Sequence, residues 1–535
     1  MEGNGARGLS TSRLIFKATL VIALFNLLSR VLGFVREMVI ARQFGATAVT
    51  DAYLVAYTIP YVLFAILSQA LAAVVVPVFT EYAARGERRE AWHLSANVIN
   101  LLFVVLAVLA AVGILAAPLV VKVVAPGLPP ETSALAADLS RIMFPTLVFA
   151  GVATLFSGFL NANNIFGIPA FSGAVNNIVI IVAALTAGSL FGIRGLAWGT
   201  VAGMVLSALV QVPTLRRAGF RFSLGLDWRH PGVQKILVLV MPVTLGISIS
   251  QAYVIVDRIL ASLLPEGSIA ALNYATKLVQ LPVSLFVLAV STAVFPSLTQ
   301  WVAEGRLDEV SSAMRRAMRI IILVTIPAGV GLMVLRTPII RLLFERGAFD
   351  ARATEMTAVA VFFYASGLVA LAANILLTRG FYAFQDTKTP VRMLGINIAA
   401  NIILSLILIR PMGLGGLALA AVLSALLNTF LLVRHLDRRL PGLWHASWLG
   451  FTARVVLAAG ALAWAAQAAD AALAGAAASL GTAGLALRVA AGITAGLAAY
   501  AAACVALRFE EVGLARRELE NLTRRLRRAA FSRAR

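Results

Sequence analysis

The sequence predicts an all-α integral membrane protein. Of its 535 residues, 60% are hydrophobic and only 13% are charged, whereas soluble domains are about 45–50% apolar and about 25% charged. Lipid offers backbone groups no hydrogen-bond partner, so apolar segments in a bilayer form helices. A spanning helix needs about 20 apolar residues. Fourteen such segments are centred near residues 28, 65, 106, 147, 181, 205, 248, 283, 330, 367, 400, 424, 458 and 494.

The first twelve predicted spans contain a weak internal repeat with an offset near 220 residues. Five ordered pairs share this offset: Pro60 and Pro282, Pro77 and Pro296, Pro169 and Pro390, Asn176 and Asn397, Gly195 and Gly416. Six spans per copy is an even number, so both copies have the same topology. They are expected to form two six-helix lobes related by a pseudo-two-fold axis along the membrane normal, with two extra C-terminal helices. Chance similarity between apolar segments is the alternative.

The predicted spans divide the chain into six parts. These are a cytoplasmic N-terminal tail (1–14), an N-lobe with spans 1–6 (15–218), a cytoplasmic linker (219–235), a C-lobe with spans 7–12 (236–436), two Ala-rich spans (446–507) and a basic tail (508–535). Apolar residues of the basic tail fall on one helical face among arginines, which is typical of helices lying on anionic membranes. A solvated charged helix is the alternative.

The distribution of basic residues predicts the orientation. The net charge is +21, but Lys and Arg gather in alternate loops, and such loops lie in the cytoplasm. An even number of spans then places both termini on the cytoplasmic side of the membrane, and the loop pattern argues against a nucleic-acid partner. Cys504 is the only cysteine, which excludes disulfides within the chain and Cys-based metal sites.

The first span carries charge deep inside an apolar run. Arg30, Arg36 and Glu37 lie between Ile15 and Ala41. A lone Arg at the bilayer centre costs at least ~2.5 kcal/mol, so such residues face a bundle interior or a watery cavity. Arg presents a planar fork that suits phosphate or carboxylate. We therefore predict a cationic cavity for an anionic ligand such as a pyrophosphate. Arg–Glu pairs that only fix helix packing are the alternative.

Two further charged positions extend this site. Asp51, with Thr50, begins the second helix; it is either an N-cap or a gate partner for an Arg on a neighbouring helix. Lys277 lies on the eighth predicted span and either adds a cation to the cavity or extends towards the headgroups.

A sodium site is a further hypothesis. Asp257 and Arg258 stand inside the apolar run 254–264, and Arg258 is grouped with Asp51 as a gate or structural residue. Asn397 and Asn401 are four residues apart and share a helical face. With Asp257 they would offer oxygen ligands to Na⁺. Buried Asn residues that hydrogen-bond between helices are the alternative.

No enzyme constellation is present in the sequence. The four histidines lie near predicted helix ends or loops, none at HExxH spacing, and there is no P-loop or GxSxG motif. The sequence thus predicts a transporter without a cofactor. Its energy would come from an ion gradient, such as one of Na⁺, from the membrane potential or from the substrate gradient.

Several stretches together resemble the MurJ lipid II flippase family. They are SRVLGFVRE at 29–37, FGA at 44–46, TDAY at 50–53, IPA at 168–170, GLAWG at 195–199, LFERGAF at 343–349 and QDTKTP at 385–390. The resemblance covers most of residues 15–440 and implies a member of the MOP exporter superfamily. In that family the residues matching Arg30, Arg36, Glu37 and Asp51 are functionally important. The family's eighth-helix Arg falls on Lys277, and a second-helix Arg of some relatives falls on Phe64, which puts a carried-over role at Phe64 in doubt.

The resemblance implies a function in peptidoglycan biosynthesis. The protein would carry lipid II, a polyprenyl-pyrophosphate-linked disaccharide-peptide, from the inner to the outer leaflet of the bacterial inner membrane by alternating access. Residues 446–507 would form a groove for the lipid tail. We expect a monomer whose partners are lipid II, membrane lipids and the cell-wall synthesis machinery.

Other functions remain open at the level of sequence. One is a MOP exporter of another polyprenyl-linked oligosaccharide or of a drug, although a drug exporter should show cavity carboxylates. A membrane glycosyltransferase would need a carboxylate or His centre. A non-transporting scaffold would hold the buried charges only as structural pairs.

Overall fold

Helices make up most of the part of the chain that the computed structural model describes, namely residues 3–85, 88–440, 442–443, 447–475, 478–509 and 511. No strand occurs in these residues, which confirms the predicted all-α class. Contacts between helices define two compact units. The first comprises Met1–Ala271 with Phe344–Ala353, and the second comprises Leu272–Leu343 with Thr354–Arg535. The lobe boundaries drawn from the sequence stay a prediction, and most of the predicted basic tail lies outside the described residues.

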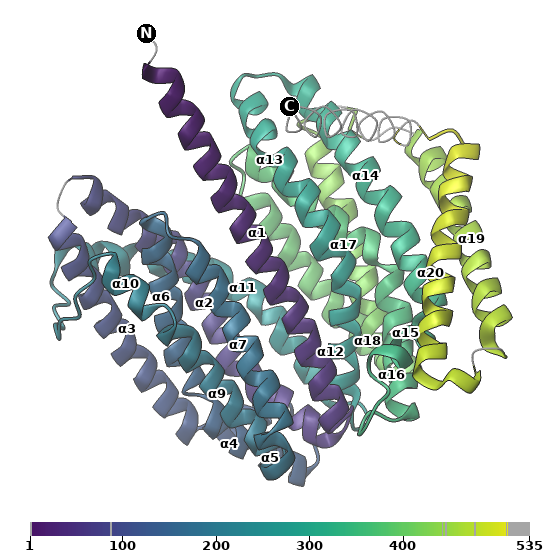
Figure 1. Cartoon of the computed structure of the whole chain (residues 1–535), viewed down its shortest axis with the longest axis horizontal. Coiled ribbons are helices and arrows are strands. Elements are labelled where there is room, and N and C mark those ends of the chain that lie inside the picture. The colour runs from purple at the N-terminus through teal and green to yellow at the C-terminus, as the bar shows by residue number, and fades with distance from the viewer. Residues whose placement is uncertain are drawn as a thin grey trace, which may run out of the picture. The chain divides into compact units, whose positions relative to one another are not determined.

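Among the described residues, the first unit contains eleven complete helices and the starts of two more. They are α1 (Gly3–Phe44), α2 (Ala48–Ala84), α3 (Arg88–Leu115), α4 (Ala117–Val124), α5 (Pro130–Met143), α6 (Thr146–Ala162), α7 (Gly167–Leu185), α8 (Ala187–Phe191), α9 (Ile193–Leu209), α10 (Val212–Arg217), α11 (Pro231–Ser262), the first turn of α12 (Ser268–Pro282) and the first residues of α16 (Ala351–Ser366). Helix α1 begins inside residues 1–14, the predicted tail. It forms one long helix, shown in purple in Figure 1.

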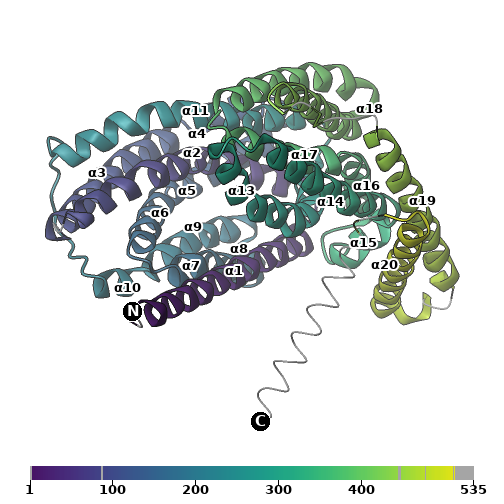
Figure 2. The same ribbon diagram turned by 90° about the horizontal axis from the view of Figure 1, so that it is seen from above.

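The second unit continues from α12. It contains a π-helix η1 (Val283–Val287), α13 (Leu288–Ala303), α14 (Leu307–Val334), α15 (Arg336–Leu343), α16 (Ala351–Ser366), α17 (Leu368–Ala383), α18 (Lys388–Asp437), α19 (Ser447–Ala474), a 3₁₀ turn η2 (Ala478–Leu480) and α20 (Gly481–Ala506). The first residues of α16 belong to the first unit. The two Ala-rich helices α19 and α20 lie side by side (Figures 1 and 2).

The number of spanning helices is consistent with the predicted fourteen. Among the described residues, eleven helices are long and apolar enough to cross a membrane, and α16 with α17, bent by 46°, makes a twelfth. Helix α18 joins two predicted spans across Gly413, whose φ of 53° interrupts the helix. Helix α1 contains the predicted span near residue 28. The protein is therefore a multi-pass membrane protein.

Small residues and aromatic rings hold the first unit together. Helix α1 packs along α7 (Figure 2), and a Cβ on Gly173 would lie only 2.8 Å from Ser29 Oγ. Small residues at such crossings let helices approach closely in lipid. Near the start of α3, the ring centroids of Phe79 and Trp92 lie 5.0 Å apart, and those of Trp92 and Phe220 lie 5.8 Å apart. This cluster fixes the start of the segment that connects α10 to α11.

Candidate functional site

Arg36 is held on α1 by two polar partners. Its Nη2 donates to Glu37 Oε1 at 2.7 Å and its Nη1 donates to Asn177 Oδ1 at 3.1 Å. Glu37 is buried and Arg36 is half-buried. The Arg–Glu pair considered as a packing device is therefore present. It leaves part of the guanidinium unused.

One donor of Arg36 has no acceptor. Its Nε–H is buried and makes no hydrogen bond in the structure. Buried donors without partners are rare in native proteins, and each calls for a ligand, a water molecule or a functional reason. The Arg36 guanidinium is thus fixed in orientation by Glu37 and Asn177, with spare capacity for an additional acceptor.

Asn177 is a residue of this site that the sequence analysis missed. It is buried on α7, and its Nδ2 donates to Ser29 O at 3.0 Å and to Gly173 O at 3.1 Å. It thereby joins α1 to α7 while its Oδ1 positions Arg36. The available signal was a pair of adjacent Asn residues inside an otherwise apolar span, of which only Asn176 had been singled out, as a repeat anchor.

Arg30 lies one to two turns before Arg36 on the same helix. It is exposed at the surface of the first unit, whereas Arg36 is half-buried. Helix α1 continues without interruption through Gly33, whose Cα faces Asn177. The joint use of Arg30 and Arg36 by one ligand stays a prediction.

Asp51 caps the start of α12. Its Oδ2 accepts from Gly267 N at 2.7 Å and its Oδ1 accepts from Ala270 N at 2.8 Å, and the residue is only 3% exposed. These are N–H groups that α12 itself cannot satisfy. Asp51 therefore acts as a helix cap, as one hypothesis held, but for a different helix from its own. The charge of Arg258 also acts on this carboxylate, and Arg258 Nε donates to Thr58 Oγ1 at 3.1 Å.

Backbone contacts surround this cap. Ala348 N donates to Arg42 O at 2.8 Å, which brings the LFERGAF stretch onto the end of α1. A Cβ on Gly347 would lie 2.4 Å from Arg42 O, and a Cβ on Gly267 would lie 2.1 Å from Ala46 O. Both glycines have positive φ. Only glycine allows the backbones to meet this closely, so the turn after α1 is clasped by the segments around 267 and 347.

The remaining predicted site residues occupy both units. Asp257 lies half-buried on α11 in the first unit. Lys277 lies half-buried on α12 in the second unit and forms no ion pair with any described residue. Asn401 is buried and its Nδ2 donates to Ser424 Oγ at 3.5 Å, whereas Asn397 Oδ1 is buried without a partner. A sodium site formed by Asp257, Asn397 and Asn401 stays a prediction.

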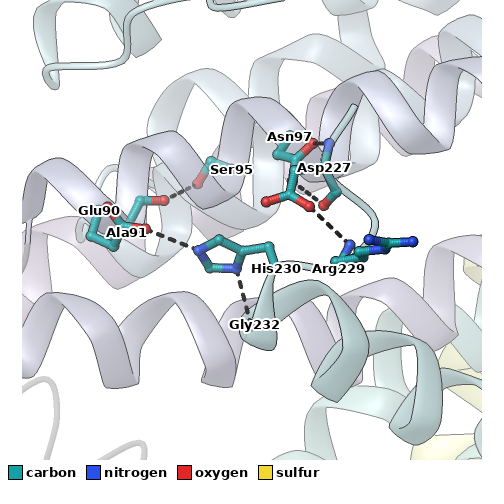
Figure 3. A network of polar contacts seen from close by, with 8 residues as sticks. All are labelled: Glu90, Ala91, Ser95, Asn97, Asp227, Arg229, His230 and Gly232. Atoms are coloured by element: carbon teal, nitrogen blue, oxygen red, sulfur yellow. Dashed lines mark hydrogen bonds and ion pairs between the residues drawn. The ribbon is translucent and has the colours of Figure 1, made fainter. Parts of the chain in front are cut away.

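Glu90, His93 and His230 form the only group of three metal-type ligands found in the described part of the chain. Their hydrogen bonds do not suit a metal ion. His230 Nδ1 accepts from Gly232 N at 3.0 Å, so Nε2 carries the ring hydrogen and donates to Glu90 Oε1 at 2.9 Å (Figure 3). A metal-bound histidine instead donates from its second nitrogen. This cluster caps α11 and ties it to α3.

The QDTKTP stretch forms a turn before α18. Asp386 accepts from Thr389 N at 2.9 Å, from Thr389 Oγ1 at 2.7 Å and from Arg439 Nη2 at 2.6 Å. Burial of this carboxylate raises its pKa, but the Thr389 donors, the Arg439 charge and the Lys388 N–H together outweigh burial and hold the pKa of Asp386 below its usual value. The stretch therefore joins the start of α18 to the residues that follow its C-terminal end.

Comparisons with known proteins agree with this architecture. The family model "Lipid II flippase MurJ" matches residues 40–477. The lipid II flippase MurJ of Burkholderia cenocepacia is 35% identical over 457 residues, covering 83% of this chain and 88% of that protein. The probable lipid II flippase MurJ of Vibrio cholerae is 33% identical over 473 residues, covering 85% and 90%.

Solved structures share the fold. A lipid II flippase MurJ in an inward closed conformation matches with a TM-score of 0.76 at 24% identity, over 91% of this chain and 99% of that one. An inward-facing multidrug resistance MATE transporter of the MOP superfamily matches with a TM-score of 0.67 at 14% identity, over 79% and 98%. At these identities the two structures support the fold alone. The length and level of the sequence matches decide the family: this chain belongs to the MurJ lipid II flippases.

Proposed function

We propose that this protein is a lipid II flippase. It moves the undecaprenyl-pyrophosphate-linked peptidoglycan precursor from the inner to the outer leaflet of the bacterial cytoplasmic membrane by alternating access. Membership in the MurJ family supports this proposal, and Arg36 is the observation in the site that carries it. A guanidinium fixed by Glu37 and Asn177, with one buried N–H left over, suits an oxyanion ligand.

The chemistry of the substrate explains the need for such a residue. A headgroup with a pyrophosphate and sugars cannot cross ~30 Å of hydrocarbon unaided. Charge-assisted hydrogen bonds from Arg to phosphate are about twice as strong as neutral ones. Arg36, with Arg30 and Lys277, would shelter the pyrophosphate during passage while the polyprenyl chain stays in lipid. Residues 446–507 would guide that chain.

Alternating access requires contacts that open and close. The cap formed by Asp51 on Gly267 and Ala270 is suited to this role because it joins separate helices through a few hydrogen bonds. Opening would expose two backbone donors to water, which can solvate them. Arg258 would stabilise the closed arrangement through its charge. Asp257, Asn397 and Asn401 would couple the cycle to Na⁺.

The remaining properties follow as part of the proposal. The protein would act as a monomeric transporter without catalytic chemistry. Both termini would lie in the cytoplasm, as the basic loops predict. The outer-leaflet product would supply the cell-wall synthesis machinery.

The test is exchange of lipid II between leaflets in proteoliposomes, together with complementation of a bacterial strain depleted of its own flippase. Arg36→Ala removes all donors, and we expect flipping to fall by about 10–100-fold, from the worth of hydrogen bonds to charged groups. Arg36→Lys keeps the charge but loses the planar fork of the guanidinium, so its activity should lie between those of the parent protein and Arg36→Ala. Arg141→Ala, at an exposed ion pair with Asp138, is the matched control. Full flipping by Arg36→Ala would overturn the proposal.

A further inference from the structure

An exposed apolar segment connects α10 to α11. We name residues 219–229 the strap (Figure 2). From 222 to 228, large apolar side chains alternate with small or polar residues. Phe222, Leu224, Leu226 and Trp228 are 62%, 91%, 57% and 58% exposed, respectively. Such exposure in a row marks an interaction surface.

The strap is not loose chain. Its second residue, Phe220, is buried against Trp92. Asn100 of α3 donates to Ser223 O at 2.7 Å and to Gly225 O at 2.9 Å. Asn97 exchanges two hydrogen bonds with the backbone of Asp227, at 2.6 and 2.8 Å (Figure 3). The strap is therefore held against α3 along its length, with its apolar side chains left outside.

A groove lies beside the strap. It has a volume of about 680 Å³ and is lined mainly by apolar side chains of α3, α6, α9 and the strap, among them Phe103, Val104, Phe149, Leu209, Phe222 and Leu224. Asn100 contributes a polar side chain to the lining, but its amide N–H groups already donate to backbone carbonyls of the strap. The lining therefore suits a hydrocarbon chain better than a polar ligand.

The groove continues into the exposed face of a spanning helix. Beyond Phe103 and Val104, the same helix exposes Val108, Val112 and Leu115. Because α3 is long and apolar enough to cross a membrane, this exposed apolar face suits contact with acyl chains. A lipid could enter the groove from the bilayer without crossing a polar barrier.

Positive charge lies on the strap and on α10 just before it. Arg216, Arg217 and Arg221 are exposed, and none of them pairs with a described carboxylate. The guanidinium of Arg229 stacks on Trp228 at 5.1 Å. Basic residues beside a membrane attract anionic lipid, and Trp is enriched at the interface between lipid and water.

From this arrangement we propose that the strap and its groove bind one anionic phospholipid, with an acyl chain in the groove and the phosphate on Arg216, Arg217 and Arg221. The site is separate from Arg36 and does not depend on the proposed flipping activity. The lipid would hold the α10–α11 connection at the membrane surface.

The experiment uses the full chain in detergent and two lipids with the same acyl chains, phosphatidylglycerol and phosphatidylcholine. Binding is counted by native mass spectrometry. A phosphatidylglycerol with a diazirine on one acyl chain then locates the site by crosslinking. We expect preferential binding of phosphatidylglycerol, with crosslinks in residues 99–104, 149–156 or 205–226.

Variants test each half of the site. The triple variant R216Q/R217Q/R221Q should lower the affinity for phosphatidylglycerol by about tenfold or more. The matched control R316Q/R392Q/R434Q removes equal charge at exposed positions of the second unit and should bind normally. Val104→Trp fills the groove mouth and should abolish the crosslinks. Monodisperse elution of each variant shows that it is folded.

Three results would overturn the proposal. One is equal binding of the two lipids, and another is equal loss of affinity in both triple variants, which would mean general attraction to charge. The third is loss of the crosslinks when an equimolar polyprenyl pyrophosphate is added before photolysis, which would assign the groove to the substrate. Failure of lipid II exchange in the unmodified protein would leave these outcomes unaffected, so the two proposals fail separately.

Discussion

Asp51 and Gly267, 216 residues apart, are joined by a 2.7 Å hydrogen bond from the Gly267 N–H to the Asp51 carboxylate. A second bond reaches Ala270, so one side chain near the start of α2 completes the first turn of α12. The contact is buried and charge-assisted. It gives the gate hypothesis for Asp51 a concrete partner, the backbone at the start of α12, in addition to the Arg first considered.

Asp51→Asn should weaken this cap. Asn keeps one acceptor oxygen but replaces the other with an NH₂ group, so one of the two bonds is lost and the other is no longer charge-assisted. At about 1.5–3 kcal/mol for such a bond, the amides of Gly267 and Ala270 should exchange hydrogen roughly 10–100-fold faster. Hydrogen-exchange mass spectrometry of the peptide around 267–270 measures this. Asp138→Asn, at an exposed surface pair, is the control, and unchanged exchange in Asp51→Asn would refute a cap.

Gly347→Ala should disrupt the clasp on the end of α1. Its φ is +62° and the new Cβ would lie 2.4 Å from Arg42 O. Gly305→Ala is a matched control because Gly305 also has a positive φ, +73°, but has nothing within 4 Å of the new Cβ. Both variants should lose about 1 kcal/mol from the left-handed backbone. Only Gly347→Ala should lose more, seen as a lower melting temperature and reduced flipping. Equal melting temperatures would mean that the close approach contributes nothing.

Asn177→Ala should separate the positioning of Arg36 from its charge. The variant removes the acceptor for Arg36 and the donors to Ser29 O and Gly173 O. We expect a loss of about 1–3 kcal/mol of stability and reduced flipping with Arg36 intact. Asn176→Ala is the control. The Oδ1 of Asn176 is buried without a partner, so its removal should change stability little. Equal effects of the two variants would argue against a role in positioning.

Asp386 should make the stability of the second unit depend on pH. Its pKa is lower in the folded chain than its ordinary value of 3.8, so the folded state favours the carboxylate. The stabilisation is fully present above about pH 4 and is lost as the pH falls through the lower folded pKa.

Unfolding of the parent protein and of Asp386→Asn between pH 7 and pH 3 tests this. The variant should be less stable by about 1–2 kcal/mol at pH 7, and the two curves should converge in acid. Arg439→Gln should show a smaller loss of the same sign, because that side chain is 40% exposed. A constant difference between parent and Asp386→Asn down to pH 3 would exclude the Asp386 contribution.

Sequence reasoning identified the chemistry of the site but not its contacts. Arg36 and Glu37 stood out because charge inside an apolar span is costly, and that cost can be read without a fold. Asn177 did not stand out, since its importance comes from lying beside Arg36, 141 positions away. Likewise, a polar residue such as Asp51 at a helix start suggests a local cap, and only the packing of α2 against the start of α12 makes it a cap for another helix.

By itself the sequence determined the membrane class, the helical secondary structure and the family. These follow from the apolar length of each segment and from local motifs, which act over one or two helical turns or along one span. Tertiary structure alone decided which backbone donors Asp51 satisfies, which nitrogen of Arg36 stays unpaired, and that the strap leaves its apolar side chains exposed beside a groove. Those outcomes depend on distances between segments far apart in the chain, which hydropathy and spacing do not encode.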